Sequence, residues 1–562
     1  MFKEIAIMTI ALSTTGKMTN VNYLNDCEQR NIKQYIIDSG VNKNNNNFEF
    51  EVFYDINAPE GISNREKISF FTNINEREKE KINNNSKFSG LIDYSKTMPI
   101  LSLKYNNVAY DDCISELEQV LNNSNIYQII VRDSEELFTN EDNPSYYNYL
   151  DDNEMLIDTF SNNDNSFIDY RNIKYDNYRT TNYTGKGIKI GVAGGSGDYI
   201  DLNFENFKGY DIRLLSPELS NYNRIGTHLK EVLSIMTGKY GIAPLATTYV
   251  VDGDSSSYSN FRYMDTFVKL GVDIIEFSGV SSAVDKTPYF NYLVYNYGVC
   301  IVTGSYNEFD NNYYQPSSAT NVISVGSIDS NYNIISGENN IPSSESKGFR
   351  IVAMGGDRFV NNISRKLNGT SYATPAVAGT IALLMEKNNI LKGNPALVMA
   401  TLGNSANMSI INRSNMPNGV IEEFTNAGIY TWSGVGALDI NQALWLVGSV
   451  GIIPGMESLS IGVHDLFSIT DAKANQRIYL THAWLKSSQY YNNKYTNDKI
   501  SDLDIMIYNS SGEVVARRVS SNSALERLDY KVPEDGDYFV KVYVYSNNSN
   551  NNLKYGITCV RA

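Results

Sequence analysis

The chain has 562 residues, of which 42% are hydrophobic, and its 63 acidic residues outweigh 47 basic ones to give a formal net charge of −16. A chain of this length is expected to form roughly two to four domains, and its hydrophobic content excludes a disordered chain. The acidic balance without a basic run argues against nucleic acid and anionic membrane as partners. No apolar run approaches the roughly 18 residues that span a bilayer, so an integral membrane protein is not expected.

The N-terminal part of the sequence predicts an α+β domain over residues 1–140. Its opening, "MFKEIAIMTIALSTTGK", has an apolar core from Ile5 to Leu12 that is typical of an export signal or of a first strand, and Glu4 is unusual for a signal. The strand-like stretches "FEFEVFYDI", "MPILSLKY" and "YQIIVRD" accompany one amphipathic helix, "DDCISELEQVLNNS". Residues 141–182 are rich in Asn, Asp and Tyr and predict a linker and surface loops.

The middle of the sequence, residues 183–448, predicts an α/β domain. Strand-like and helix-like stretches alternate there, for example "GIKIGVA", "HLKEVLSIMTG", "ATTYVVDG", "YMDTFVKLG", "VDIIEFSG", "NYLVYNYG", "VCIVTG" and "NVISVGSI". This alternation indicates a mainly parallel sheet with helices on both faces. Residues 449–562 change to short alternating strands such as "DLDIMIYNSSGEVVARR" and "GDYFVKVYVY", which predict a small all-β sandwich.

Cysteines and acidic residues give little indication of a metal site. Four cysteines, at positions 27, 113, 300 and 559, are too few and too scattered for a disulfide framework or a zinc site, although Cys27 and Cys113 could pair if the N-terminal region folds them together. Asp502, Asp504 and Asp535 are open to two interpretations, calcium ligands or a solvated loop. We therefore predict no cofactor, with calcium as the one possibility left open.

One segment places a serine where a nucleophile could lie. "LNGTSYATPAVAGTIALLME" sets Ser371 in a Gly-Thr turn directly before an apolar run that predicts a helix. A serine hydroxyl becomes a good nucleophile only beside a base. The chain offers three histidines, His228, His464 and His482, and the last two belong to the C-terminal β region.

This segment resembles the nucleophile segment of the subtilisin-like serine proteases, the subtilases. Further stretches resemble that family in the same order, from about residue 170 to 447: "TGKGIKIGVAGGSG", "IGTHLKEVLSIMTGKYGIAPLA", "VDIIEFSG", "VCIVTGSYNEF", "SSATNVISVGSID" and "GVGALDINQAL". The resemblance implies a three-layer subtilisin-like domain. It also implies that the N-terminal region is similar to the family's inhibitory propeptide. The C-terminal region resembles the pre-peptidase type of β-sandwich that follows secreted bacterial proteases, which favours an extracellular or cell-surface setting.

The resemblance also marks departures from the family's catalytic residues. It implies an aspartate at the end of the first core strand, where this chain has Gly194, and a base histidine where it has Ile225. His228 matches the family's second histidine. Three residues along a helix turn a side chain by about 300° and raise it by about 4.5 Å, so we expect His228 to be structural rather than a substitute base.

Other positions of the family's site are retained or altered. Ser371 is kept, and Asn307 matches the asparagine of the family's oxyanion hole. With no base beside it, we expect Ser371 to cap backbone amides at the helix start. The substrate-pairing strand carries Ser278, Gly279 and Val280 where the family usually has Ser-Leu-Gly, so its groove is expected to be altered.

These residues predict a catalytically inactive subtilisin-like pseudoprotease that binds or regulates a protein or peptide partner. One alternative is a working bacterial endopeptidase that uses Ser371 with a rearranged base, such as His228 or an acid, and another is a structural surface protein. Some spore-forming clostridia use degenerate subtilases to regulate germination, but those carry an inserted β domain, and only 146 residues separate Ile225 from Ser371. The partner and the oligomeric state are left open.

Overall fold

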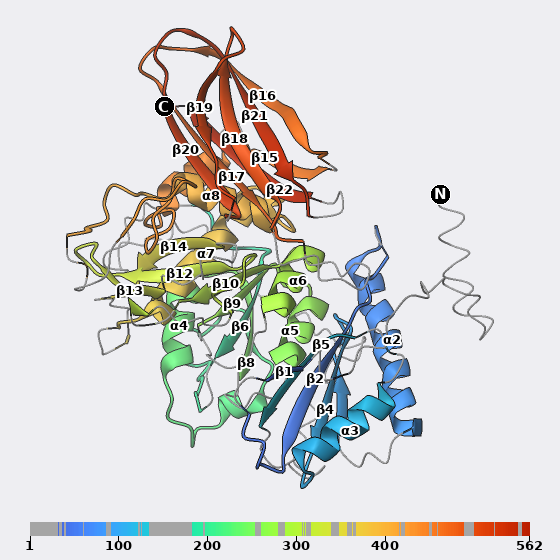
Figure 1. Cartoon of the computed structure of the whole chain (residues 1–562). Helices are drawn as coiled ribbons and strands as arrows, with labels where there is room; N and C mark the ends of the chain where they lie inside the picture. The colour runs from blue at the N-terminus through green and yellow to red at the C-terminus, as the bar shows by residue number, and fades with distance from the viewer. Residues whose placement is uncertain are drawn as a thin grey trace.

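The computed structural model describes three successive regions of the chain (Figure 1). The described residues are 32, 36–38, 41–59, 61–85, 91–121, 124, 126–133, 182–194, 197–252, 260–278, 287–305, 307, 309–310, 316–338, 348–356, 362–363, 367–414, 416, 422–448, 452–457, 459–487, 500–521, 523–548 and 553–561. The apolar opening segment, Cys27, most of the expected linker, and Gly279 and Val280 lie outside them.

The N-terminal region is a five-stranded sheet with two helices on it. Its strand order is β1-β5-β2-β4-β3, and β2 pairs antiparallel with both β4 and β5. Every residue of β2 is buried, including Glu51 and Glu49, which accepts a hydrogen bond from Ser102 Oγ at 2.8 Å, and the other residues of the strand are aromatic or β-branched. The elements are β1 (Ile36–Asp38), β2 (Phe48–Tyr54), α2 (Asn64–Asn85), β3 (Leu91–Tyr94), β4 (Ile100–Tyr105), α3 (Tyr110–Val120) and β5 (Ile126–Asp133).

The expectation of a single helix in this region is wrong, because α2 is a second and longer one. Its sequence is dominated by Asn, Glu and Lys, which hides the apolar face. Phe71 and Ile82 are buried on that face, and so is Asn75, whose amide donates to the carbonyls of Ser95 and Met98 at 2.6 Å. A buried asparagine is stabilised here by two tertiary hydrogen bonds that no local pattern announces.

The central region contains a nine-stranded sheet. Its order is β11-β13-β12-β10-β9-β6-β8-β7, with β14 also paired to β12. The pairs are parallel except for β12 with β13, as the strand–helix alternation predicted. The strands are β6 (Lys189–Gly194), β7 (Ile212–Leu214), β8 (Thr247–Asp252), β9 (Ile274–Phe277), β10 (Cys300–Gly304), β11 (Phe309–Asp310), β12 (Ile323–Ile328), β13 (Ile334–Glu338) and β14 (Phe349–Met354).

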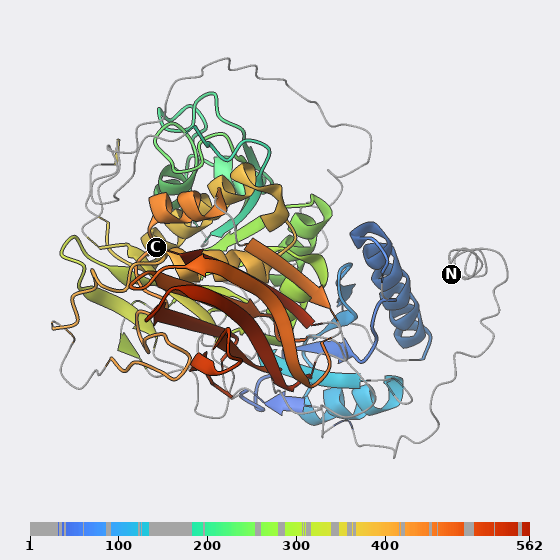
Figure 2. The same ribbon diagram turned by 90° about the horizontal axis from the view of Figure 1, so that it is seen from above.

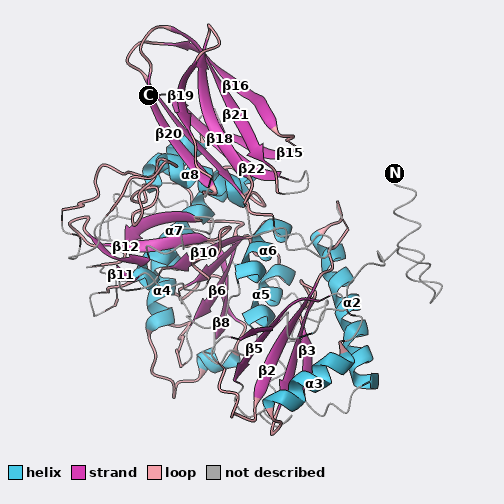
Figure 3. Ribbon diagram, in the orientation of Figure 1, coloured by secondary structure: helices cyan, strands magenta, loops and turns pink. Residues whose placement is uncertain are grey.

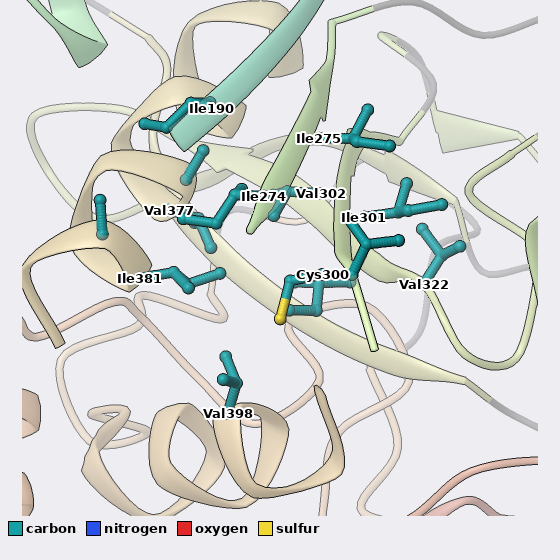
Figure 4. Close-up of a cluster of buried hydrophobic side chains, with 14 of the residues drawn as sticks. Ile190, Ile274, Ile275, Cys300, Ile301, Val302, Val322, Val377, Ile381 and Val398 are labelled. Atoms are coloured by element: carbon teal, nitrogen blue, oxygen red, sulfur yellow. The ribbon is translucent and has the colours of Figure 1, made fainter. Parts of the chain in front are cut away.

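Helices cover both faces of this sheet, which gives three layers (Figure 3). Neighbouring residues of one strand point to opposite faces: Ile274 points toward α7, whereas Ile275 points away from it (Figure 4). Most buried side chains of the sheet and its helices form one core, and a smaller cluster around Ile328, Ile334 and Val352 lies beside it. The helices are α4 (His228–Met236), α5 (Asn260–Lys269), α6 (Thr287–Tyr297), α7 (Thr370–Lys387), α8 (Pro395–Ser405) and α9 (Ile440–Val447).

The C-terminal region consists of two four-stranded antiparallel sheets, ordered β15-β22-β17-β20 and β16-β21-β18-β19. Viewed from above, their strands lie over the central region (Figure 2). Strand β22 rests on α8, where Thr558 Oγ1 donates to the carbonyl of Ala400 at 2.9 Å. The strands are β15 (Ile452–Glu457), β16 (Gly462–Ala472), β17 (Arg477–Trp484), β18 (Asp502–Asn509), β19 (Val514–Arg518), β20 (Leu525–Lys531), β21 (Gly536–Ser546) and β22 (Leu553–Arg561).

The N-terminal region packs against α5 and α6, which lie between its sheet and the central sheet (Figure 1). Asp265 of α5 is buried and accepts hydrogen bonds from Ser95 Oγ at 3.0 Å, from the Lys96 amide at 2.6 Å and from Thr97 Oγ1. Tyr297 of α6 donates its hydroxyl to the carbonyl of Thr97 at 2.6 Å. The loop between β3 and β4 is therefore held to the central region by several buried hydrogen bonds.

Two further observations concern cysteines and membrane spans. Cys113, Cys300 and Cys559 are buried free thiols. Burial raises the pKa of the Cys113 thiol to about 12 and that of the Cys559 thiol to about 12, so both stay protonated at neutral pH.

Across the described part of the chain, no helix combines the length and the apolar character needed to cross a membrane.

Candidate functional site

The position of the nucleophile is built by the start of α7. Gly369, with φ of +139°, precedes the helix, and Thr370 and Ser371 are its first residues. Ser371 Oγ donates to the backbone carbonyl of Ser278 at 3.2 Å, and this is its one hydrogen bond to the described residues. The expectation that Ser371 caps backbone amides is therefore wrong. That role falls to Asn307, whose Oδ1 accepts from the Thr370 amide at 2.9 Å.

The side-chain oxygen of Asn307 is bound to the start of α7. Its Oδ1 accepts from both the amide and the hydroxyl of Thr370, at 2.9 and 3.0 Å. Because these bonds fix the amide oxygen on the helix start, Nδ2 is left as the donor. An amide donor beside a serine at a helix N-terminus could stabilise negative charge on a reacting oxygen. Sequence and structure bring Asn307 and Ser371 to the same helix end.

Gly194 stands where the resemblance implies an aspartate, and the side chain of Leu229 lies close against it. Gly194 is buried at the end of β6, and a Cβ added to it would meet Leu229 Cδ1 at 2.5 Å and Cδ2 at 2.9 Å. Contacts that short do not occur in folded proteins, so Leu229 must move before any side chain can stand at position 194. Leu229 could not be singled out from its sequence context, because its importance depends on the approach of α4 to β6.

The position where the resemblance implies the base histidine is occupied by an exposed isoleucine. Ile225 is 91% exposed and precedes α4 by three residues. Asp198, farther along the loop after β6, accepts hydrogen bonds from the backbone amides of His228 and Leu229, both at 3.1 Å. This carboxylate therefore caps the N-terminus of α4, where negative charge is favourable.

His228 lies beside Tyr372 and makes no hydrogen bond to Ser371. The His228 and Tyr372 rings are 5.8 Å apart between centroids, and the Tyr372 hydroxyl donates to Glu231 Oε2 at 2.7 Å. Glu231 is buried and also accepts from Thr227 Oγ1 at 3.1 Å. These contacts join α4 to α7.

Glu276 is a buried acid next to this site that sequence reasoning missed. It lies on β9, fully buried, and contacts Ser278 Oγ, which donates to the carbonyl of Ser371 at 3.0 Å. Burial raises the pKa of Glu276 from 4.5 to about 8. A hydroxyl has one proton, so when Ser278 donates to Ser371 the proton between Ser278 and Glu276 comes from the neutral carboxyl. Two reciprocal hydrogen bonds join the end of β9 to the start of α7: Ser278 Oγ donates to the Ser371 carbonyl, and Ser371 Oγ donates to the Ser278 carbonyl.

The Glu276→Gln variant is expected to be more stable than the unaltered protein at high pH. The pKa of Glu276 is about 8 in the folded protein and 4.5 in the unfolded chain. The contribution of Glu276 to the free energy of unfolding is therefore greatest below pH 4.5, and it is lost as the pH rises from 4.5 to 8. Glutamine keeps the size without the charge, so we expect roughly 2–4 kcal/mol greater stability at pH 9 and little difference near pH 4. Urea unfolding of both proteins at pH 4, 7 and 9 measures this, and an equal slope with pH in the two proteins would contradict it.

Of the three acidic residues considered for calcium, Asp502 and Asp504 lie close enough to repel each other, and the structure records no contact of Asp535 with either. Asp535 contacts Lys473, with Oδ2 at 3.3 Å from Nζ, and accepts from the Ala474 amide at 2.9 Å, whereas Asp502 and Asp504 lie on β18. Burial raises the pKa of Asp504 to about 6. Among the described residues, no group of three or more His, Cys, Asp or Glu side chains is arranged to hold a metal ion. His482 is buried in β17 and burial lowers its pKa to about 3, and His464 lies on β16.

Comparison with known proteins finds relatives of the central region. Residues 220–428 match the sequence model of the subtilase family, a range that includes Ile225, Ser278, Asn307 and Ser371 but not Gly194. This part of the chain is subtilisin-like. Subtilisin DY of Bacillus licheniformis is 28% identical over 242 residues, which cover 38% of this chain and 82% of that protein. Subtilisin Savinase of Lederbergia lenta is 29% identical over 229 residues, which cover 36% and 78%.

Among solved structures, the prenylagaramide maturation protease PagA is 23% identical, with a TM-score of 0.35. The match covers 46% of this chain and 93% of PagA. The self-cleaved protease domain of PatA is 21% identical with a TM-score of 0.35, over 47% of this chain and 98% of that domain.

Proposed function

We propose that this chain is a catalytically inactive subtilisin-like protein that binds a protein or peptide partner. The observation that carries the proposal is the environment of Ser371, whose hydroxyl donates to a backbone carbonyl instead of to a base. The positions of the family's acid and base hold Gly194 and Ile225. In subtilisin, removal of the catalytic triad costs about 2 × 10⁶ in kcat, and a loss of that size would end useful peptide hydrolysis.

Binding of a peptide in the groove of such a site does not require the catalytic triad. In the family, the strand that ends near Ser278 receives extended peptides by main-chain pairing, and that mode of binding uses backbone groups that substitutions leave in place. Asn307 and the start of α7 supply further donors at one end of it. We propose that an extended peptide segment of a partner protein is the ligand class.

We further propose that residues 1–140 are a propeptide-like domain that stays attached, with residues 141–182 as linker and the subtilisin-like domain over 183–448. Its buried hydrogen bonds to Asp265 and Tyr297 support attachment, and an inactive site could not remove it. Residues 449–562 are proposed to be a β-sandwich of the pre-peptidase type. The likeness to proteases of this class favours an extracellular or cell-surface location.

A working endopeptidase is the second candidate, and the retained Asn307, bound to the start of α7, is the observation in its favour. It needs a base at Ser371 Oγ. Glu276 is the buried acid linked to this site, but it contacts the hydroxyl of Ser278 and not that of Ser371. Because neither Glu276 nor His228 contacts the nucleophile, this function ranks second.

The experiment that tests the proposal follows the mass of the protein over time. We expect the unaltered full chain and its Ser371→Ala variant to keep the same intact mass during days of incubation. We also expect a mixture of short peptides to bind both proteins without being cut. Loss of an N-terminal fragment or peptide cleavage in the unaltered chain alone would show that Ser371 is active and would support the second candidate.

A further inference from the structure

The C-terminal end of α6 is bound by residues from both ends of the chain. The last carbonyls of a helix have no partner inside it, and here Gly298, with φ of +69°, ends the helix. The Tyr295 carbonyl accepts a hydrogen bond from Lys554 Nζ of β22, and the Asn296 carbonyl accepts one from Lys67 Nζ of α2 at 2.6 Å. In Figure 1, α6 lies between α2 and β22.

Aromatic rings strengthen both attachments. Lys67 Nζ lies 5.7 Å from the centroid of the Tyr297 ring, and Lys554 Nζ lies 4.6 Å from that of Tyr295. Asn64 Nδ2 adds a longer bond of 3.4 Å to the Tyr297 carbonyl. Three consecutive carbonyls are therefore capped from outside the helix, and the negative end of its dipole attracts both lysines.

The two lysines compete for this helix end because they carry the same charge. Their acceptors are adjacent residues of one helical turn, so the two ammonium groups are held close together. Burial lowers the pKa of Lys67, and burial followed by the charge of Lys67 lowers the pKa of Lys554 to about 8. Within the described part of the chain, neither lysine forms an ion pair with a carboxylate.

We propose that the end of α6 couples the attachment of the N-terminal region to that of the C-terminal region with opposite sign. Each lysine lowers the attraction of the helix end for the other. A partner that draws β22 away from α6 would then tighten the hold on α2, and removal of the N-terminal region would tighten the hold on β22. Such coupling is reciprocal by thermodynamic linkage. This coupling does not depend on whether Ser371 is catalytically active or on whether a peptide binds beside it.

The test uses the full chain and hydrogen exchange of backbone amides read by mass spectrometry. At pH 7 we expect Lys554→Met to slow the exchange of α2 by about threefold to thirtyfold, the range for one charge removed at several Å in a partly solvated site. Lys67→Met is expected to slow the exchange of β22 in the same way. The matched control is Lys79→Met, because Lys79 is on the same helix but contacts the Tyr94 ring within the N-terminal region, and it should change neither.

A second arm uses pH to test whether the charge of Lys554 causes the effect of its substitution. Lys554 is charged below its pKa of about 8, so the coupling is present at pH 7 and lost at pH 9.5. The difference in α2 exchange between the unaltered chain and Lys554→Met, compared at equal pH, should therefore vanish at pH 9.5. Unchanged or faster exchange of α2 in Lys554→Met at pH 7, or a difference that persists at pH 9.5, would overturn the coupling.

Discussion

A triple substitution, Gly194→Asp with Ile225→His and Leu229→Ala, is expected to give Ser371 a reactivity that the unaltered protein lacks. Aspartate and histidine supply the missing acid and base, and alanine clears the space that the Leu229 methyl groups occupy. Since the whole triad contributes about 2 × 10⁶ in subtilisin, even a poorly aligned one should raise the rate of serine acylation by about 10³. The measurement is the labelling rate with a fluorophosphonate.

The double variant that keeps Leu229 is the matched control. A side chain at position 194 meets the Leu229 methyl groups at 2.5 and 2.9 Å, so the aspartate fits only if buried Leu229 moves aside. We expect the double variant to label at least about tenfold more slowly than the triple variant, because misplacing a catalytic group by about 1 Å costs up to 10²-fold. Equal rates would show that Leu229 does not obstruct the site.

The second large effect concerns the attachment of the N-terminal region. In the Asp265→Ala variant, the Ser95 and Thr97 hydroxyls and the Lys96 amide lose their acceptor. Each buried donor left without a partner costs about 1–3 kcal/mol, so we expect docking to weaken by roughly 3–5 kcal/mol. Hydrogen exchange of β4 and α2 in the full chain should then become about 10² to 5 × 10³ times faster.

Two milder variants make that test specific. Asp265→Asn keeps one side-chain carbonyl oxygen as an acceptor and should weaken docking by an intermediate amount. Tyr297→Phe removes a single 2.6 Å hydrogen bond to the Thr97 carbonyl. We expect Tyr297→Phe to weaken docking by about 1 kcal/mol. If all three variants exchange at the rate of the unaltered chain, this surface does not hold the N-terminal region.

The sheet of the central region could be predicted because its strands are short apolar runs bounded by turn residues. The stretch "VCIVTG" is such a run, and β10 is buried throughout. Helix α2 could not be predicted in the same way, since its buried Asn75 is stabilised by the carbonyls of Ser95 and Met98 from another element. Periodicity reports the apolar face of a segment but not the polar partners that tertiary structure supplies.

The candidate site shows the same division. Gly194, Ile225, Asn307 and Ser371 could be found by their place in motifs. Leu229 and Glu276 could not, because their effects depend on distances across layers: the approach of Leu229 to β6, and the burial that raises the pKa of Glu276 to about 8. The role of Ser371 at the helix start could not be predicted either, because Asn307, which lies in the loop between β10 and β11, accepts the hydrogen bond from the Thr370 amide.

The measurement that tests the central claim most directly is fluorophosphonate labelling of the unaltered full chain beside Ser371→Ala, with an active subtilisin as positive control. The absence of a base at Ser371 Oγ predicts that both proteins stay unlabelled while the control reacts to completion. Stoichiometric labelling of the unaltered chain that disappears in Ser371→Ala would contradict the account, because it would require a base that the structure does not place at the nucleophile.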